Sequence, residues 1–381
     1  MRICLIANPN SPHTRRCVES LFRRGHELHL IGEHALERDS PSGCVFHDLT
    51  RRINVRKVRY LTWALAVRSL VRRIRPDIVH AIGVASAGWL GAGSGFHPFM
   101  VSAMGSDLLL LGRRSIAHRM LSRWAIAQAD HVACISQELA ARAGRLGVPA
   151  ERIDVLCWGV DVQVFHPLPD RRGIREKLGV EDVPTVLSIR AMREIYHPLD
   201  LVRAIPGVLA AVPTARFIFF TYNADPALLA RVQAVVAEQG VAHAVTYVGS
   251  LSGDLAIADY YRVADVAVSV PESDGTPFSV LEAMSCGTPV VASDLPSLRD
   301  WIKHGSNGLL VPVGDVEALR DALVRLLLDP GLRREMGRNA VNVVRERGDS
   351  RGFAERIEQV YRHLVDRGEL SGCGGMPGEA P

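Results

Sequence analysis

Long apolar runs are missing from this sequence. In 381 residues no apolar stretch approaches the ~18 to 20 residues that a membrane-spanning helix needs. The first residues, MRICLIANPNSP, also lack the apolar stretch and small-residue cleavage site of a secretory signal. We therefore expect a protein that stays in the cytoplasm and has no membrane-spanning helix.

Close cysteine pairs and metal-ligand patterns are missing as well. The seven cysteines are scattered and odd in number, which is typical of reduced thiols and argues against a disulfide framework or a zinc site. No Asp-X-Asp pair occurs, and no group of His, Cys and carboxylates has the spacing of metal ligands. We expect no metal and no cofactor, so any developing charge in a reaction must be stabilised by the protein itself.

The charge is unevenly distributed. The net charge is +4, but residues 1–80 carry 15 lysines and arginines against 7 acidic residues. The basic clusters at 51–59 and 68–75 either attract an anionic membrane surface or an anionic acceptor, or are solvated helix faces. Aromatic residues do not interleave with these charges and no recognition motif accompanies them, so we do not expect nucleic acid as a partner.

Short apolar runs alternate with amphipathic stretches over the first part of the chain. Strands that are apolar on both faces belong in a parallel sheet covered by helices, so residues 1–165 are predicted to form a doubly wound, Rossmann-like domain. The expected strands are RICLIA, ELHLIG, DIVHAIG, FMVSAMG, HVACIS and IDVLCWG, and the expected helices are Thr14–Arg24, Val58–Ile74, Ser115–Gln128 and Gln137–Leu146.

The stretch VDVQVFHPLPDRRG, with two prolines and a glycine, interrupts this alternation, which then restarts. Residues 166–347 are predicted to form a second doubly wound domain, since a single core rarely grows beyond ~250 to 300 residues. Its expected strands are PTVLSIRA, ARFIFFTY, VTYVGS, DVAVSVP, PVVASD and GLLVP, and its expected helices are Pro198–Val212, Pro226–Gln239, Asp254–Val263, Phe278–Ser285, Val316–Leu328 and Pro330–Arg347. A helix at 348–367 is expected to pack back on the first domain, and the Gly- and Pro-rich residues 368–381 to be disordered. Two such domains would place the carboxyl ends of both sheets at a shared cleft.

The segment PESDGTPFSVLEAMSCGTPVVASD, residues 271–294, is the most informative one. A strand ends just before it, a turn of small and polar residues follows, and a helix begins near Phe278. Such a helix points unpaired N–H groups and the positive end of its dipole toward a ligand, which suits a phosphate. Asp274 and Glu282 supply carboxylates that can accept hydrogen bonds from sugar or ribose hydroxyls, although an acid in the first turn of a helix is also favourable as a partner of the dipole.

This segment resembles the acidic strand-to-helix signature of glycosyltransferase family 4, a retaining group with the GT-B fold. WIKHGSNGLLVPVGDVEALRDAL resembles the closing strand and helix of that family, and ADHVACISQELAARAGRLGVPAERIDVLCWGVDVQVFHP resembles its interdomain crossing. The likeness is weaker over the first 110 residues, where RPDIVHAIG and SAMGSDLL are the recognisable pieces. The resemblance implies a GT-B fold in which two Rossmann-like domains face each other across a cleft.

The resemblance also implies site residues. Glu282 matches the residue that binds the donor ribose, Asp274 stands where the family usually has a glutamate near the transferred sugar, and Arg190 matches the arginine that neutralises the leaving diphosphate. The family lysine that follows this arginine is missing from RAMREIYHPLDL, and Arg193 is a hypothetical replacement. The remaining donor-binding residues that the resemblance implies are Gly275, Thr276, Phe278 and Ser279 at the turn, and Gly249, Ser250 and Leu251 near the base.

The acceptor side is less well defined. The Gly-rich turn that the family has after its first strand is replaced by NPNSPHT, and Met104 stands where a histidine is expected. His13 either faces the cleft or is an ordinary surface histidine, and His80 is either a site residue or a packed core histidine. Asp107 is better explained as a capping residue than as a base.

Together these features predict a metal-independent, retaining hexosyl- or N-acetylhexosaminyltransferase that uses a UDP- or GDP-sugar. Its acceptor would be a glycan, a lipid-linked or a small molecule, as in polysaccharide biosynthesis, with a peripheral position on the inner face of the cell membrane as one interpretation. Two alternatives stay open at this point. One is a nucleotide-sugar epimerase or hydrolase on the same scaffold, and the other is a catalytically weakened binding protein, for which Met104 and the missing lysine argue.

Overall fold

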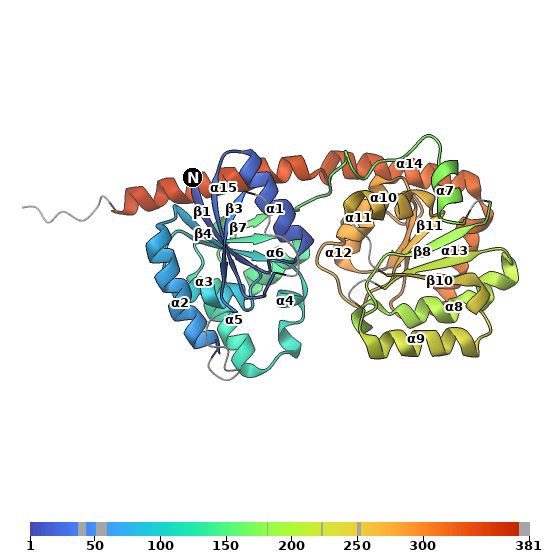
Figure 1. Cartoon of the computed structure of the whole chain (residues 1–381), viewed down its shortest axis with the longest axis horizontal. Helices are drawn as coiled ribbons and strands as arrows, with labels where there is room; N and C mark the ends of the chain where they lie inside the picture. The colour runs from blue at the N-terminus through green and yellow to red at the C-terminus, as the bar shows by residue number, and fades with distance from the viewer. Residues whose placement is uncertain (37–42, 51–58, 181, 222–223, 250–252, 373–381) are drawn as a thin grey trace, which may run out of the picture. The chain divides into compact units, whose positions relative to one another are not determined.

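The computed structural model describes residues 1–36, 43–50, 59–180, 182–221, 224–249 and 253–372. The chain forms two compact units, the first from Met1–Trp158 with Arg351–Pro381 and the second from Gly159–Ser350 (Figure 1). The proline-based prediction placed these divisions at 165–166 and 347–348. In the structure Val160 and Asp349 form a parallel β-bridge, with the Val160 N–H donating to the Gly348 carbonyl at 2.8 Å. This bridge joins residues 159–165 to the second unit.

The first unit is built on a seven-stranded parallel sheet with the strand order β3-β2-β1-β4-β5-β6-β7. The interior strand β1 is almost fully buried, as expected for an apolar run between two layers of helices. Its strands are β1 (Arg2–Ala7), β2 (Glu27–Gly32), β3 (Cys44–Asp48), β4 (Ile78–Ile82), β5 (Phe99–Ala103), β6 (His131–Cys134) and β7 (Ile153–Val155). Its helices are α1 (Pro12–Arg23), α2 (Arg59–Ile74), α3 (Ala87–Ser94), α4 (Ser106–Leu109), α5 (Ile116–Gln128), α6 (Gln137–Arg145) and α15 (Ser350–Gly372).

The second unit is built on a six-stranded parallel sheet with the strand order β10-β9-β8-β11-β12-β13. Its core packs strand side chains such as Val186 and Phe217 against helix side chains such as Val202. Its strands are β8 (Thr185–Ser188), β9 (Arg216–Phe220), β10 (Val245–Val248), β11 (Val266–Ser269), β12 (Val290–Ser293) and β13 (Leu309–Val311). Its helices are α7 (Arg172–Lys177), α8 (Pro198–Ala211), α9 (Pro226–Glu238), α10 (Asp254–Val263), α11 (Phe278–Ser285), α12 (Pro296–Arg299), α13 (Val316–Leu328) and α14 (Pro330–Arg347). The two sheets confirm the prediction of two doubly wound α/β domains, and none of the helices in the described part of the chain is long and apolar enough to cross a membrane.

The sequence pattern did not indicate β3 or α3. Helix α3 has the sequence AGWLGAGS, whose glycines disfavour a helix in isolation. In the structure these glycines permit close packing, because a Cβ atom on Gly91 would lie 2.4 Å from the ring of Phe99. Tertiary packing thus overrides a weak local propensity.

Helix α15 packs on the first unit through polar and aromatic contacts. The ring of Phe353 stacks on Trp158 with centroids 5.0 Å apart, and the Arg24 guanidinium donates a short hydrogen bond to Glu358. Tyr361 lies deeper, with its hydroxyl 2.6 Å from Nδ1 of His80. The helix continues to Gly372, five residues into the tail that was predicted to be disordered, and residues 373–381 lie outside the described residues.

The buried His80 predicts a pH dependence of stability. Burial lowers its pKa to about 3, assisted by His131, against an ordinary value of 6.5. As the pH falls below about 6.5 the unfolded chain binds a proton that the folded chain excludes, so His80 costs up to about 1.4 kcal/mol of stability per pH unit until its folded pKa is reached. Denaturant unfolding of the first unit between pH 7 and 4.5 should therefore show a flatter pH slope for His80→Gln than for wild type. The exposed His243→Gln is the control, and equal slopes for wild type and His80→Gln would refute the assignment.

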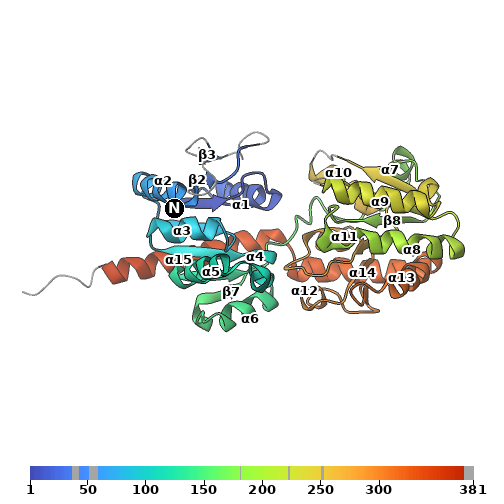
Figure 2. The same ribbon diagram turned by 90° about the horizontal axis from the view of Figure 1, so that it is seen from below.

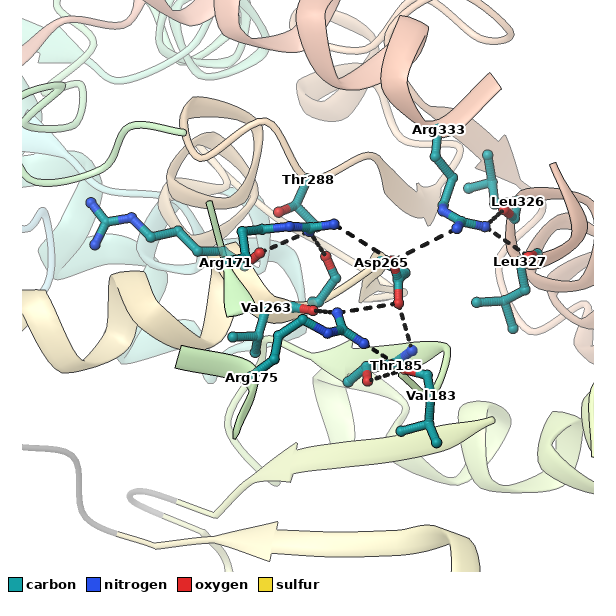
Figure 3. Close-up of polar contacts among 12 residues, drawn as sticks. Arg171, Arg175, Val183, Thr185, Val263, Asp265, Thr288, Leu326, Leu327 and Arg333 are labelled. Carbon is teal, nitrogen blue, oxygen red and sulfur yellow. Dashed lines mark hydrogen bonds and ion pairs between the residues drawn. The ribbon is translucent and has the colours of Figure 1, made fainter. Parts of the chain in front are cut away.

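The second unit contains a buried ionic cluster around Asp265, at the amino end of β11 (Figure 3). One carboxylate oxygen of Asp265 accepts a hydrogen bond from the Thr185 N–H at 2.9 Å. Guanidinium nitrogens of three arginines surround the carboxylate, Arg175 at 3.5 Å, Arg333 at 3.8 Å and Arg171 at 3.9 Å. All three arginines also donate to main-chain carbonyls at helix ends: Arg171 to Arg262 and Arg175 to Val263 of α10, and Arg333 to Leu326 and Leu327 of α13. The cluster fastens α7, α10, α13 and α14 to the amino ends of two strands.

Candidate active site

The candidate site lies where the strand order of the second sheet reverses. Strands β8 and β11 are hydrogen-bonded neighbours, yet the chain leaves β8 toward β9 and leaves β11 toward β12 on the other side. Their carboxyl ends form the switch point at which open α/β sheets bind ligands. Arg190 follows β8 and the segment 270–277 follows β11, so both reach the same edge of the sheet.

Arg190 is held on several sides. Its Nη1 lies 3.0 Å from Oδ2 of Asp274 and donates to the Ser279 hydroxyl at 3.1 Å. Its guanidinium carbon lies 4.1 Å from the centre of the Tyr196 ring, a cation–π contact. Burial disfavours the charged guanidinium, but Asp274 and Tyr196 together outweigh this effect and raise the pKa of Arg190. The site therefore contains a permanent, pre-positioned cation.

Asp274 makes an ion pair, but one of its carboxylate oxygens accepts no hydrogen bond from the described residues. Its Oδ2 atom is buried and forms no hydrogen bond to any residue that the structure describes, although it lies in ionic contact with Arg190. The distance between Nη1 of Arg190 and Oδ2 of Asp274 is that of an ion pair, but the two groups are not aligned for a hydrogen bond. A buried carboxylate oxygen in this state can still accept a hydrogen bond from a ligand hydroxyl.

Glu282 lies within α11, one turn after its start, and is buried. Its Oε2 accepts a hydrogen bond from the Tyr261 hydroxyl at 3.0 Å. Burial raises the pKa of Tyr261 well above its usual value, and the charge of Glu282 raises it further, so Tyr261 remains a neutral donor. The pair fixes the orientation of the carboxylate.

Helix α11 begins at Phe278, as predicted, directly after Pro277, whose side chain makes no capping hydrogen bond. Gly275, Thr276 and Phe278 are buried around this start. The chain just after the C-terminal end of α11 packs against α14. Gly337 of α14 approaches so closely that a Cβ atom there would lie 2.2 Å from the Gly287 carbonyl oxygen. The result is a rigid helix N-terminus directed at the switch point, the arrangement that binds anions through main-chain N–H groups.

The segment that replaces the family lysine has an unusual backbone. His197 has a positive φ of 47°, and its Nδ1 lies 3.0 Å from Oδ2 of Asp200. The Glu272 N–H donates to the Ile195 carbonyl at 2.9 Å, which ties this segment to the loop after β11. Tyr196 rather than a cation thus lies against Arg190, while the Arg193 side chain is exposed and its predicted role stays a prediction. The sequence pattern gave no signal for the stacking of Tyr196 on Arg190.

The remaining predicted donor residues are only partly described. Gly249 follows β10 and is exposed, whereas Ser250 and Leu251 lie outside the described residues. No group of three or more His, Cys, Asp or Glu side chains that could hold a metal ion occurs within the described ranges.

The predicted acceptor-side residues lie in the first unit and differ in character. His80 is fully buried, with one ring nitrogen 2.6 Å from the Tyr361 hydroxyl and the other 2.7 Å from the Ser102 hydroxyl. Asp107 accepts hydrogen bonds from the main-chain N–H groups of Val84 at 2.8 Å and Gly105 at 2.9 Å, so it joins the turns after β4 and β5. Burial raises the pKa of Asp107 against these hydrogen bonds. His13 is partly exposed on α1, with its ring 6.4 Å from that of Trp158.

Comparison with known proteins identifies the family and the fold. Residues 2–136 match the family model described as glycosyl transferase 4-like, and residues 170–343 match glycosyl transferases group 1. The chain is 25% identical over 361 residues to N-acetyl-alpha-D-glucosaminyl L-malate synthase of Bacillus anthracis, covering 91% of this chain and 92% of that protein. It is 32% identical over 230 residues to D-inositol 3-phosphate glycosyltransferase of Acidothermus cellulolyticus, covering 58% of this chain and only 50% of that protein.

Solved structures show the same fold over most of the chain. Sucrose-phosphate synthase of Thermosynechococcus elongatus matches with a TM-score of 0.83 and 22% identity, covering 96% of this chain and all of that one. Anabaena HepE, in complex with UDP and glucose, matches with a TM-score of 0.80 and 18% identity at the same coverage. The two family models span strands β1–β6 of the first sheet and all strands of the second sheet. The chain therefore belongs to glycosyltransferase family 4, has the GT-B fold, and is an enzyme of nucleotide-sugar-dependent glycosyl transfer.

Proposed function

We propose that this enzyme transfers a hexosyl or N-acetylhexosaminyl group from a UDP- or GDP-sugar, with retention of anomeric configuration and without a metal ion. The observation that carries the proposal is the buried Arg190–Asp274 pair at the switch point, beside the start of α11. Because Anabaena HepE has been solved with UDP and with UDP-glucose, UDP is the first nucleotide to test. The family models and the names of the relatives favour transfer over the epimerase or hydrolase alternative.

In the proposed mechanism the donor diphosphate binds at the start of α11. As the bond between the sugar and the diphosphate lengthens, negative charge grows on the phosphate and the sugar becomes oxocarbenium-like. Arg190 and the first-turn N–H groups stabilise this charge without reorganisation, because they are already positioned. Arg193 is proposed as a second cation, in place of the family lysine.

The two carboxylates receive different roles. Oδ2 of Asp274 accepts a hydrogen bond from a hydroxyl of the transferred sugar, and the same carboxylate holds Arg190 beside that sugar. Glu282, oriented by Tyr261, accepts hydrogen bonds from the ribose hydroxyls of the nucleotide. Aspartate keeps the charge of the usual glutamate with a shorter reach.

The acceptor is proposed to be a glycan, a lipid-linked or a small molecule, which the first unit would bind. The excess of arginine and lysine in residues 1–80 supports an anionic acceptor or a peripheral position on an anionic membrane. The names of two relatives refer to malate and to D-inositol 3-phosphate, so small anionic acceptors are the first to screen.

A thermal-shift screen with UDP, GDP, ADP, dTDP and CMP tests the donor site. One nucleoside diphosphate at 100 times its Kd should stabilise the protein by about 2.7 kcal/mol, with the same shift in EDTA as in Mg²⁺. Glu282→Ala should remove most of this shift, whereas Glu335→Ala, an exposed acid on α14, should preserve it. A shift that requires Mg²⁺ would refute metal independence, and no shift with any nucleotide would refute the donor site. With donor and acceptor in hand, NMR of the product would show whether the anomeric configuration is retained.

A further inference from the structure

Helix α5 presents its largest apolar side chains away from the sheet. Ile116 is 68% exposed and Met120 is 66% exposed, and Trp124 continues the same line at a spacing of four residues. The opposite face, which carries Ala125 and Ile126, is buried. A surface helix normally shows the reverse pattern, with polar residues outward. The apolar ridge on α5 therefore is not used by the core of the first unit.

The ridge on α5 is bordered by arginines. Arg119 and Arg123 are exposed and each precedes a ridge residue, Met120 or Trp124. Residues 108–129 contain four arginines and no aspartate or glutamate. The surface thus combines apolar side chains with positive charge of one sign only.

Helix α2 extends this surface. Leu61 and Leu65 are largely exposed, and Arg68 and Arg72 follow on the same face of the helix. Residues 59–75 contain five arginines and no acidic residue. Both helices pack against α3, where Trp89 contacts α2 and α5 (Figures 1 and 2). The ring of Trp89 lies 5.5 Å from that of Tyr60 on α2 and 4.8 Å from that of His118 on α5, as measured between centroids.

We propose that the exposed faces of α2 and α5 form a docking face for an anionic lipid bilayer. Leu61, Leu65, Ile116 and Met120 insert at the boundary between head groups and acyl chains, and Arg119 and Arg123 contact lipid phosphates. Trp124 suits the same depth, since tryptophan favours membrane interfaces. The inference rests on the membrane association proposed above and assigns it to a particular surface.

Charge complementarity favours lipid over a second copy of this chain. A symmetric dimer through this face would place the arginines of α2 and α5 against the same arginines of the partner, since a two-fold interface pairs a patch with itself. A layer of lipid phosphates instead meets every arginine with an opposite charge. Both helices follow strands β3 and β5 and start at the carboxyl edge of the first sheet, so docking would bring this edge close to acceptors held in the bilayer.

Vesicle sedimentation of the full chain tests the docking face. Wild type should bind vesicles of phosphatidylcholine with about 30 mol% phosphatidylglycerol, and bind pure phosphatidylcholine at least about tenfold more weakly. Ile116→Ser with Met120→Ser should lower binding to the anionic vesicles about tenfold or more, because two inserting side chains are lost. Arg119→Glu with Arg123→Glu should have an effect of similar size.

Matched variants on the second unit serve as controls. Val313→Ser with Leu328→Ser removes two exposed apolar side chains, and Arg334→Glu with Arg338→Glu reverses two exposed arginines four residues apart on α14. Both should bind anionic vesicles like wild type. A normal nucleotide thermal shift in every variant would show that the fold and the donor site are intact.

The outcomes separate the proposals. If wild type does not bind anionic vesicles, the docking face and the membrane association are both refuted, while nucleotide binding still decides the glycosyl-transfer site. If wild type binds but the α5 variants bind equally well, the membrane association stands and the docking face is wrong. If light scattering shows a wild-type dimer that Ile116→Ser with Met120→Ser dissociates, a second copy covers this face and the proposal fails.

Discussion

Arg190→Ala is expected to lower kcat/KM for sugar transfer by about 10²- to 10³-fold, the usual effect of removing one pre-positioned donor from a developing anion. The loss should fall mainly on kcat, because the charge that Arg190 stabilises is greatest in the transition state. The substitution also leaves Asp274 buried without its cation. Steady-state release of nucleoside diphosphate, measured with a donor and acceptor identified by screening, would give both constants.

Two further variants make this result specific. Arg190→Lys keeps a charge but loses the planar guanidinium that stacks on Tyr196 and donates to Ser279, so it should restore only part of the activity. Arg193→Ala tests the proposed replacement of the family lysine, and a loss of kcat comparable to that of Arg190→Ala would support it. Arg190→Ala with kcat close to wild type would show that the leaving-group charge is stabilised elsewhere.

Asp265→Asn is expected to destabilise the second unit by about 3–5 kcal/mol, the typical cost of removing one partner from a buried ion pair. Three guanidinium groups would then face each other without the carboxylate that separates their charges (Figure 3). For a unit of this size the melting temperature should fall by about 10 °C. Calorimetry would assign the change to the transition of the second unit, because Asp265 has no role in the first.

The surface pair of Asp170 with Arg172 provides the control. Its nitrogen–oxygen distance of 2.8 Å is shorter than any in the Asp265 cluster, but Arg172 is almost fully exposed. Solvent screens such pairs, so Asp170→Asn should change the melting temperature far less than Asp265→Asn. If both substitutions lowered the melting temperature equally, burial would not be the reason why the Asp265 cluster stabilises the second unit.

Local sequence pattern predicted much of the second unit. Helix α11 was predicted at its observed bounds, Phe278–Ser285, because an apolar strand, a turn of small residues and an apolar helix follow one another without interruption. The bounds of α13 and α14 were also predicted correctly. Each of these signals lies within a few residues of the element that it specifies, so no long-range contact is needed to recognise it.

The polar contacts of the site could not be predicted in this way. Arg190 and Ser279 are 89 residues apart in the chain, and they meet because β8 and β11 are neighbours in the sheet. Which strands become neighbours depends on the crossover connections rather than on any local pattern.

By itself, the sequence determined the alternation of strands and helices, two doubly wound domains and a family signature around Asp274 and Glu282, because periodicity and turn chemistry are local properties. Only the tertiary structure decided that His80 is enclosed by Ser102 and by Tyr361, 281 residues away. It also decided that Ile116 and Met120 face outward, since an amphipathic pattern does not state which face the rest of the protein will cover. Burial and charge pairing are properties of neighbours in space, and these neighbours come from distant parts of the chain.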